Sequence, residues 1–151
     1  MRNGTIKLDS MLCFAIYATG HASTRFYKPR LDALGLTYPQ YLVLIVLWEG
    51  DDITVNTLGN RLFLDSGTIT PLLKRLEARG LLSRRRDEDD ERQVRIRLTP
   101  EGRALQDKAL AVPLTIAKGT GLTREDVDRL RAELLVLRDR LDGQGEGSTP
   151  G

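Results

Sequence analysis

A single sulfur is the first place in this sequence where chemistry could occur. Cys13 is the only cysteine among 151 residues, and it lies in the stretch "LDSMLCFAIYATG". Asp9 is a good N-cap, so we expect a helix that begins there and holds Cys13 near its first turn. The free backbone amides and the helix dipole at that end favour a negative charge, and thus a reactive thiolate.

A purely structural role for this cysteine is the alternative. Leu8 and Cys13 have the spacing of a hydrophobic staple, and a lone cysteine often serves as a small apolar side chain. The tyrosines bear on the choice, because a phenol hydroxyl can donate a hydrogen bond to a thiolate. Each could equally be a core aromatic with its hydroxyl at the surface. Four of them follow the cysteine within a short distance along the chain: Tyr17, Tyr27, Tyr38 and Tyr41.

The elements that would position these side chains are helices. Apolar residues recur at helical spacing after Asp9, and Pro29 should end this first helix near Lys28. Thr37 and Gln40 have the spacing of a capping box, and the apolar run that follows stops at Gly50. We therefore expect a second, buried helix rather than a strand over residues 41–48.

The middle of the chain predicts two short helices joined by a tight turn. The first should start near Thr54, and Asp65 or Ser66 should cap the second, which Gly80 ends. The segments "LLSRRR" and "VRIRLT" then predict two strands, with the acidic "DEDDE" at the hairpin tip. The expected fold is mainly α with a small β-hairpin wing: a winged helix-turn-helix, whose second helix can enter a DNA major groove.

Charge supports a polyanionic partner for this region. Residues 66–86 hold six basic residues and only one acid, Glu77. Such a block is typical of nucleic-acid binding, although a solvated helix face beside a charged hairpin would look similar. We expect Asp90 to orient Arg92 by pairing with it. The side chains expected to contact DNA are Ser66, Thr68, Thr70, Lys74, Arg75, Arg84, Arg86 and Arg92.

The C-terminal part predicts two further helices. One should run from Pro100 to about Lys118 with a bend at Pro113, and Thr123 with Asp126 should cap the last one. Its apolar residues are spaced as in a coiled-coil seam, which fits a subunit interface or packing on the chain's own first helix. We thus expect one domain over residues 1–151: a winged helix-turn-helix (53–99) between dimerisation helices (8–49 and 100–141), and a flexible tail (143–151). The seam residues are Val127, Leu130, Leu134, Leu137 and Leu141.

Two stretches resemble a known family of bacterial repressors, the MarR family. Its DNA-binding lobe contains a Leu-x-x-Leu-x-x-x-Gly-Leu-x-x-Arg motif, an Asp-x-Arg motif in the wing and a final Leu-Thr-x-x-Gly motif. The stretch "LLKRLEARGLLSRRRDEDDERQVRIRLTPEGR" is similar to it throughout. The resemblance implies a homodimer that binds a pseudo-palindromic operator in double-stranded DNA.

The N-terminal part resembles the organic-hydroperoxide-sensing OhrR branch of that family. Those repressors carry a reactive cysteine in a Leu-Cys-Phe-Ala-x-Tyr context, similar to residues 12–17 here. They also carry two tyrosines that bond the thiolate across the dimer, in contexts matched by Tyr27 and Tyr38. With one cysteine, the chain resembles the class that lacks a resolving thiol.

The resemblance implies a repressor that releases its operator when an organic hydroperoxide oxidises Cys13. A small cellular thiol would then form a mixed disulfide with the sulfur. The alternative is a MarR-type repressor released by a small aromatic or anionic ligand, with a structural Cys13. A second alternative is a thiol peroxidase, but we do not expect an enzyme, because no resolving thiol or peroxide-activating arginine accompanies the cysteine. We expect no cofactor. One His and one Cys argue against a metal site, and no apolar run reaches membrane length. The composition separately favours a soluble cytoplasmic protein.

Overall fold

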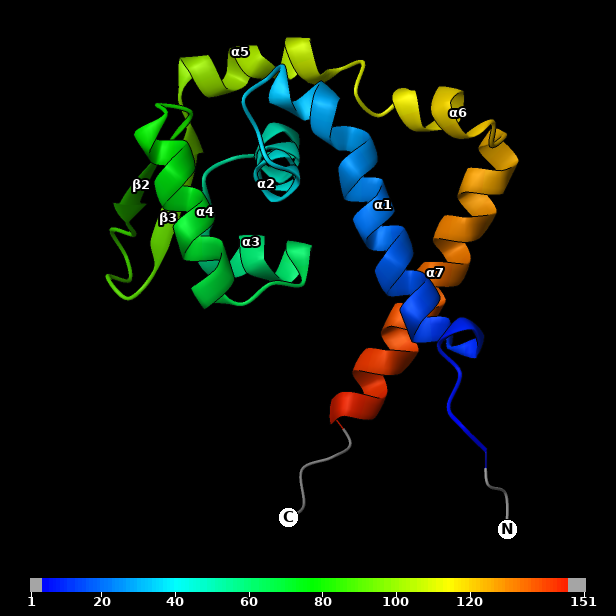
Figure 1. The fold of residues 1–151 in the computed structure, drawn as a ribbon. Helices are drawn as coiled ribbons and strands as arrows, with labels where there is room; N and C mark the ends of the chain where they lie inside the picture. The colour runs from blue at the N-terminus through cyan, green and yellow to red at the C-terminus, as the bar shows by residue number, and fades with distance from the viewer. Residues whose placement is uncertain (1–3, 147–151) are drawn as a thin grey trace. The chain divides into compact units, whose positions relative to one another are not determined.

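The computed structural model describes residues 4–146, which divide after Leu110 into two compact units. The first unit contains a 3-10 turn, η1 (Leu8–Ser10), and the elements α1 to α5 with a small sheet (Figure 1). The second contains α6 (Thr115–Thr120) and α7 (Arg124–Glu146). Each unit is described by itself below.

The start of α1 (Leu12–Asp32) differs from the expectation. Asp9 does not cap it; residues 8–10 form η1 instead, and the N-cap position is Met11, which has extended backbone and offers no side-chain cap. Ser10 closes this separate turn, because its hydroxyl and its backbone N–H both bond to the Lys7 carbonyl. Cys13 is consequently the second residue of α1 and lies in its first turn.

The end of α1 also differs, because the helix continues past Pro29 to Asp32. A proline removes one backbone hydrogen bond but leaves the rest of the turn available. Arg30 supports this turn, since its guanidinium donates to the Phe26 carbonyl at 2.7 Å and stacks 4.2 Å from the Phe26 ring centroid. Lys28 and Asp32 add an ion pair one turn apart, at 2.9 Å.

The second helix, α2 (Tyr38–Glu49), forms as predicted. Thr37 and Gln40 make the reciprocal hydrogen bonds of a capping box, and Gly50 follows the last turn. Its side chains are buried on most sides, and Val43 and Leu44 are fully enclosed. α2 is therefore the central helix of the first unit, and Figure 1 shows it nearly end-on between α4 and α1.

The helix-turn-helix is α3 (Val55–Leu62) followed by α4 (Ser66–Ala78). Asp65 caps α4 by accepting from the Thr68 N–H at 2.8 Å, and Gly80 takes a left-handed conformation just after the helix. The apolar stripe of α4 is buried as predicted, and it packs against α2, α3 and β2. Its members are Ile69, Leu72, Leu73 and Leu76.

The sheet has one strand more than the predicted hairpin. β2 (Leu82–Arg86) and β3 (Val94–Leu98) pair antiparallel, and β1 (Ile53–Thr54) pairs with the other edge of β3. β1 has only two residues, so its sequence carries no strand periodicity. Ile96 in the middle strand is completely buried, and Arg95 and Arg97 alternate with it.

The predicted long helix from Pro100 to Lys118 is interrupted. α5 (Pro100–Ala109) ends well before Pro113, a turn follows, and α6 is a separate short helix. Pro113 provides the physical reason, because its ring and missing N–H disrupt the preceding turn of a helix. Thr123 and Asp126 cap α7 reciprocally, as predicted.

In α7 the apolar seam is open to solvent within the single chain. Leu134 is 52% exposed and Leu141 is 53% exposed. The helix extends to Glu146, so the first four residues of the expected flexible tail are helical, and the others lie outside the described residues.

Candidate functional site

Cys13 is exposed at the N-terminal end of α1. The first-turn amides of a helix have no partner within it, and the Met11 N-cap offers them no side-chain acceptor, so this end of α1 favours a negative charge. Tyr17 follows one turn later, and its ring packs edge-on against His21 at a centroid distance of 4.4 Å. Residues four apart share one face of a helix, which places Tyr17 on the face that bears the cysteine.

The other three tyrosines form a cluster between α1 and α2. Tyr27 stacks on Tyr38 with centroids 5.4 Å apart, and Tyr38 lies 6.3 Å from Tyr41. Tyr41 in turn meets Trp48, whose ring nitrogen donates to the Gly102 carbonyl at 2.9 Å. The phenols are thus fixed by neighbouring rings rather than free on the surface.

Burial raises the pKa of Tyr38 and is the largest cause of the raised pKa of Tyr27 and Tyr41. Mutual repulsion raises the pKa of Tyr27 further, through Tyr38, whereas Arg30 acts in the opposite direction. The phenols therefore stay protonated throughout the physiological range, and a protonated phenol is a hydrogen-bond donor.

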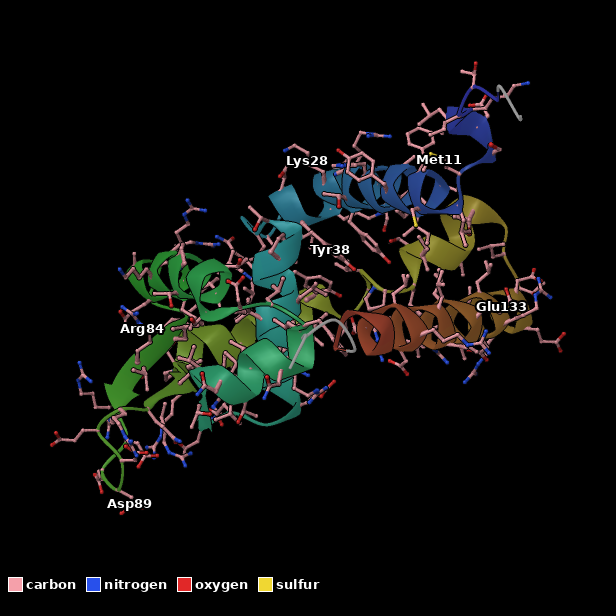
Figure 2. All side chains as sticks on the ribbon, turned by 90° about the horizontal axis from the view of Figure 1, so that it is seen from below. Met11, Lys28, Tyr38, Arg84, Asp89 and Glu133 are labelled. Atoms are coloured by element: carbon pink, nitrogen blue, oxygen red, sulfur yellow. The ribbon has the colours of Figure 1, made fainter. Side chains whose placement is uncertain are left out.

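One chain does not bring the sulfur and the tyrosine cluster together. Cys13 and Tyr27 lie on the same helix, fourteen positions apart. At about 1.5 Å per residue, that spacing corresponds to roughly 21 Å along the axis. In Figure 2, Met11 lies at one end of α1, and Lys28 and Tyr38 lie near the other end.

The predicted DNA-contact residues do come together in part. A hollow of about 230 Å³ lies between the helix-turn-helix and the wing, and Ser66 and Thr70 of α4 line it. Arg84 of β2 and Arg92 of the wing loop line the same hollow. Sequence reasoning missed two polar residues that also line the hollow, Thr54 of β1 and Asn56 of α3.

The other residues predicted to contact DNA differ in whether their side chains are exposed or bound within the protein. Thr68, Lys74 and Arg75 are exposed on α4. Arg84 is largely committed within the fold, because its backbone and guanidinium together make three hydrogen bonds to the Glu77 carboxylate. Arg86 donates to the Glu91 carbonyl at 2.8 Å, inside the wing loop.

The wing loop contains the ion pair expected of Asp90 and Arg92. Asp90 accepts from the Arg92 backbone N–H and from its Nε, each at 3.1 Å. The Arg92 side chain is nevertheless 90% exposed, so its guanidinium is held in one direction while facing solvent. That combination suits an arginine that enters a DNA groove.

The sequence analysis did not identify the pair of Asp87 and Arg95 in the wing. Asp87 is buried at the base of the wing loop, and its carboxylate binds Arg95 at 2.6 Å. The only signal was an aspartate at the start of an acidic turn, since aspartate side chains often bond backbone amides two or three residues on.

The carboxylates of this unit predict acid sensitivity. Hydrogen bonds from Arg84 lower the pKa of Glu77, and the Asp89 N–H, followed by Arg95, lowers the pKa of Asp87. A lowered native pKa stabilises the fold above the ordinary carboxyl range, and this stability is lost as pH falls through the native pKa. We expect the free energy of unfolding to fall between about pH 5 and pH 3, and less steeply in Glu77→Gln. Urea denaturation at a series of pH values measures both slopes; equal slopes would contradict the assignment.

Comparison with known proteins identifies the family. Residues 25–109 match the family model described as transcriptional regulator SarA/Rot. The chain belongs to this family of MarR-type transcriptional regulators. It is 51% identical to the HTH-type transcriptional regulator TtmR of Methylorubrum extorquens, over 98% of this chain and 75% of that protein.

Two further similarities bear on the branch and the fold. The organic hydroperoxide resistance transcriptional regulator of Bacillus subtilis is 47% identical, over 90% of this chain and 92% of that protein. The structure of reduced AbfR bound to DNA matches with a TM-score of 0.79 and 34% identity, covering 95% of this chain and 99% of that one. The predicted resemblance to MarR-type regulators of the organic-hydroperoxide branch and the winged-helix fold class are thereby confirmed.

The relatives also decide between the classes of protein considered. They are transcriptional regulators, so this member of the family is a DNA-binding regulator and not a thiol peroxidase. Among the helices of the described residues, none combines the length and apolarity that crossing a bilayer requires.

Proposed function

We propose that this regulator is a repressor that senses organic hydroperoxides through Cys13 and then releases its operator. The observation that carries the proposal is the placement of a single exposed sulfur in the first turn of α1, about 21 Å along that helix from Tyr27, which stacks on Tyr38 of α2. A second copy of the chain would supply the missing half of the site. Tyr27 and Tyr38 of one copy would then donate to Cys13 of the other.

The open seam of α7 supports a homodimer. Its five apolar residues follow a 3-4 spacing, and exposed apolar stripes of this kind mark helix–helix interfaces. A two-fold dimer carries two recognition helices related by symmetry, which fits a pseudo-palindromic operator in double-stranded DNA. The structure of reduced AbfR, a regulator of similar fold, is a complex with DNA, which supports DNA as the partner.

The proposed chemistry needs no cofactor. The thiolate attacks the terminal oxygen of the hydroperoxide, the S–O bond forms, the O–O bond breaks, and the alcohol leaves after taking a proton. The product is a sulfenic acid on Cys13, which is larger and no longer fully anionic. A small cellular thiol, of the kind expected in a cytoplasm, then condenses with the sulfenic acid to give a mixed disulfide and water.

Release of DNA follows if the altered sulfur no longer fits between the phenols. A hundredfold loss of operator affinity requires about 2.7 kcal/mol of coupling, which lies within the usual range for allosteric proteins. Rearrangement of the two phenol hydrogen bonds is of that size, since bonds to charged groups contribute about 1.5–3 kcal/mol each.

The test is operator binding by gel shift before and after treatment with cumene hydroperoxide, combined with mass spectrometry of the Cys13 peptide. We expect the wild type to lose about a hundredfold in affinity as this peptide gains one oxygen. Cys13→Ser should bind the operator as tightly before as after treatment. If Cys13→Ser also released DNA, the proposal would fail, and a repressor released by a small aromatic or anionic ligand would gain.

A further inference from the structure

The link between α2 and the sheet contains two aspartates, Asp51 and Asp52, that bind groups on β3 and α5. Asp52 has a left-handed backbone, with φ of 61°, at a position between the end of α2 and the start of β1. Asp51 accepts from the Leu98 backbone N–H and from Arg103, both at 2.9 Å. These contacts fix the link against the end of β3 and the first turn of α5.

Asp52 extends this connection to the outer face of the sheet. Its carbonyl oxygen accepts from Arg95 at 2.7 Å, and its carboxylate pairs with Arg97 at 3.2 Å. Both arginines alternate with the buried Ile96, so they project from the opposite face of β3. Hydrogen bonding by Arg97 lowers the pKa of Asp52, which keeps this carboxylate ionised.

Arg95 continues the network into the wing. It faces Arg85 across the β2–β3 pair, an arrangement that would repel without a compensating acid. Asp87 supplies the acid, at 2.6 Å, with a side chain only 8% exposed. The other oxygen of Asp87 accepts from the backbone N–H groups of Asp89 and Asp90, at 2.8 and 3.3 Å.

The network ends at the arginine that faces solvent. Asp89 lies at the far end of the wing in Figure 2, and Asp90 follows it and binds Arg92. A connected set of hydrogen bonds thus runs from Asp52, in the link after α2, through the base of the wing loop to Arg92. Arg95 and Arg97 thus bind carboxylate and carbonyl groups of the protein itself.

We propose that Asp52, Arg95 and Asp87 are positioning residues, which hold the wing loop so that Arg92 is presented to DNA. The proposal rests on the proposed DNA contact of Arg92. The positioning role predicts a change in DNA affinity opposite in sign to the change expected from net charge alone. Removing an acid from a DNA-binding surface ordinarily raises affinity for DNA, because less negative charge faces the phosphates. Removing Asp87 should lower affinity, because the loop that carries Arg92 loses its fixed geometry.

The test compares Asp87→Asn with Glu88→Gln in the full-length protein, by operator binding at several salt concentrations. We expect Asp87→Asn to lose about fivefold in affinity, the loss of about one hydrogen bond. Glu88→Gln removes the same charge from an exposed neighbour and should bind as wild type or slightly better. Asp52→Asn, which retains a side chain that tolerates left-handed backbone, should show a smaller loss of the same kind.

Epistasis with Arg92 separates positioning from a general loss of stability. In an Arg92→Ala background, Asp87→Asn should cause no further loss of affinity, whatever its effect on the thermal midpoint. An equal loss in both backgrounds would overturn the positioning role and leave Arg92 as a DNA contact. If Arg92→Ala itself bound as wild type, the contact would be wrong and the positioning role with it. Both results are independent of peroxide-induced release, which tests the proposed sensor separately.

Discussion

A heterodimer of a Cys13→Ser chain and a Tyr27→Phe, Tyr38→Phe chain should react with cumene hydroperoxide at the wild-type rate per intact site, although neither parent homodimer does. Cys13 and Tyr27 are about 21 Å apart on α1, so the reactive site should combine the sulfur of one chain with the phenols of its partner. In this heterodimer, the Cys13 that is left meets the unmodified tyrosines of the other chain.

The expected difference in rate is large. Each phenol donates a hydrogen bond to a charged group, worth about 1.5–3 kcal/mol, so losing both should slow oxidation by roughly a hundredfold or more. The Cys13→Ser homodimer forms no oxidised product at all. The rate is measured as the appearance of the oxidised Cys13 peptide, by mass spectrometry of a heterodimer purified through two different affinity tags.

A matched control carries the same three substitutions on one chain, paired with a wild-type chain. If the site forms between chains, this control has no intact site, because the wild-type sulfur meets two phenylalanines. If the site forms within one chain, the control has one intact site and reacts quickly, while the first heterodimer does not. The two arrangements therefore predict opposite orders of reactivity for the same set of substitutions.

Features encoded within four residues of one another were predictable from the sequence. Thr37 with Gln40 and Thr123 with Asp126 form the predicted caps, since a side chain and an amide three positions on must meet at a helix start. The start of α1 was not predictable in this way. Asp9 satisfies the pattern of a cap, but the competing turn closed by Ser10 takes its place.

Contacts that depend on the pairing register of two strands could not be predicted from the sequence. Asp87 and Arg95 are eight residues apart, and they meet only because the β2–β3 hairpin pairs Arg86 with Val94. A shift of one residue would move every side chain of the strand to the other face. Acids and arginines alternate in this segment with many possible pairings, so composition suggested a basic surface where the fold makes internal ion pairs.

Gly102→Ala should destabilise the first unit by about 3 kcal/mol or more, one of the largest effects available to a single methyl group. A Cβ at this position would overlap the Leu81 carbonyl oxygen and approach the Leu98 side chain to 3.1 Å. The helix cannot simply move away. Its Thr99 cap is bonded to the Gly80 carbonyl, and the Gly102 carbonyl itself accepts from Trp48.

Gly143→Ala is the matched control, since residue 143 also lies within a helix and a Cβ there meets nothing within 4 Å. Replacing an unobstructed helical glycine should stabilise the protein by about 0.5–1 kcal/mol. Urea denaturation measures both changes. Trp48 is the only tryptophan, so its fluorescence reports on the packing of α5 at this position. A shift of α5 must alter the Trp48 hydrogen bond to the Gly102 carbonyl and so the emission. A Gly102→Ala variant with wild-type stability and emission would mean that α5 packs less closely on the turn after α4 than these contacts indicate.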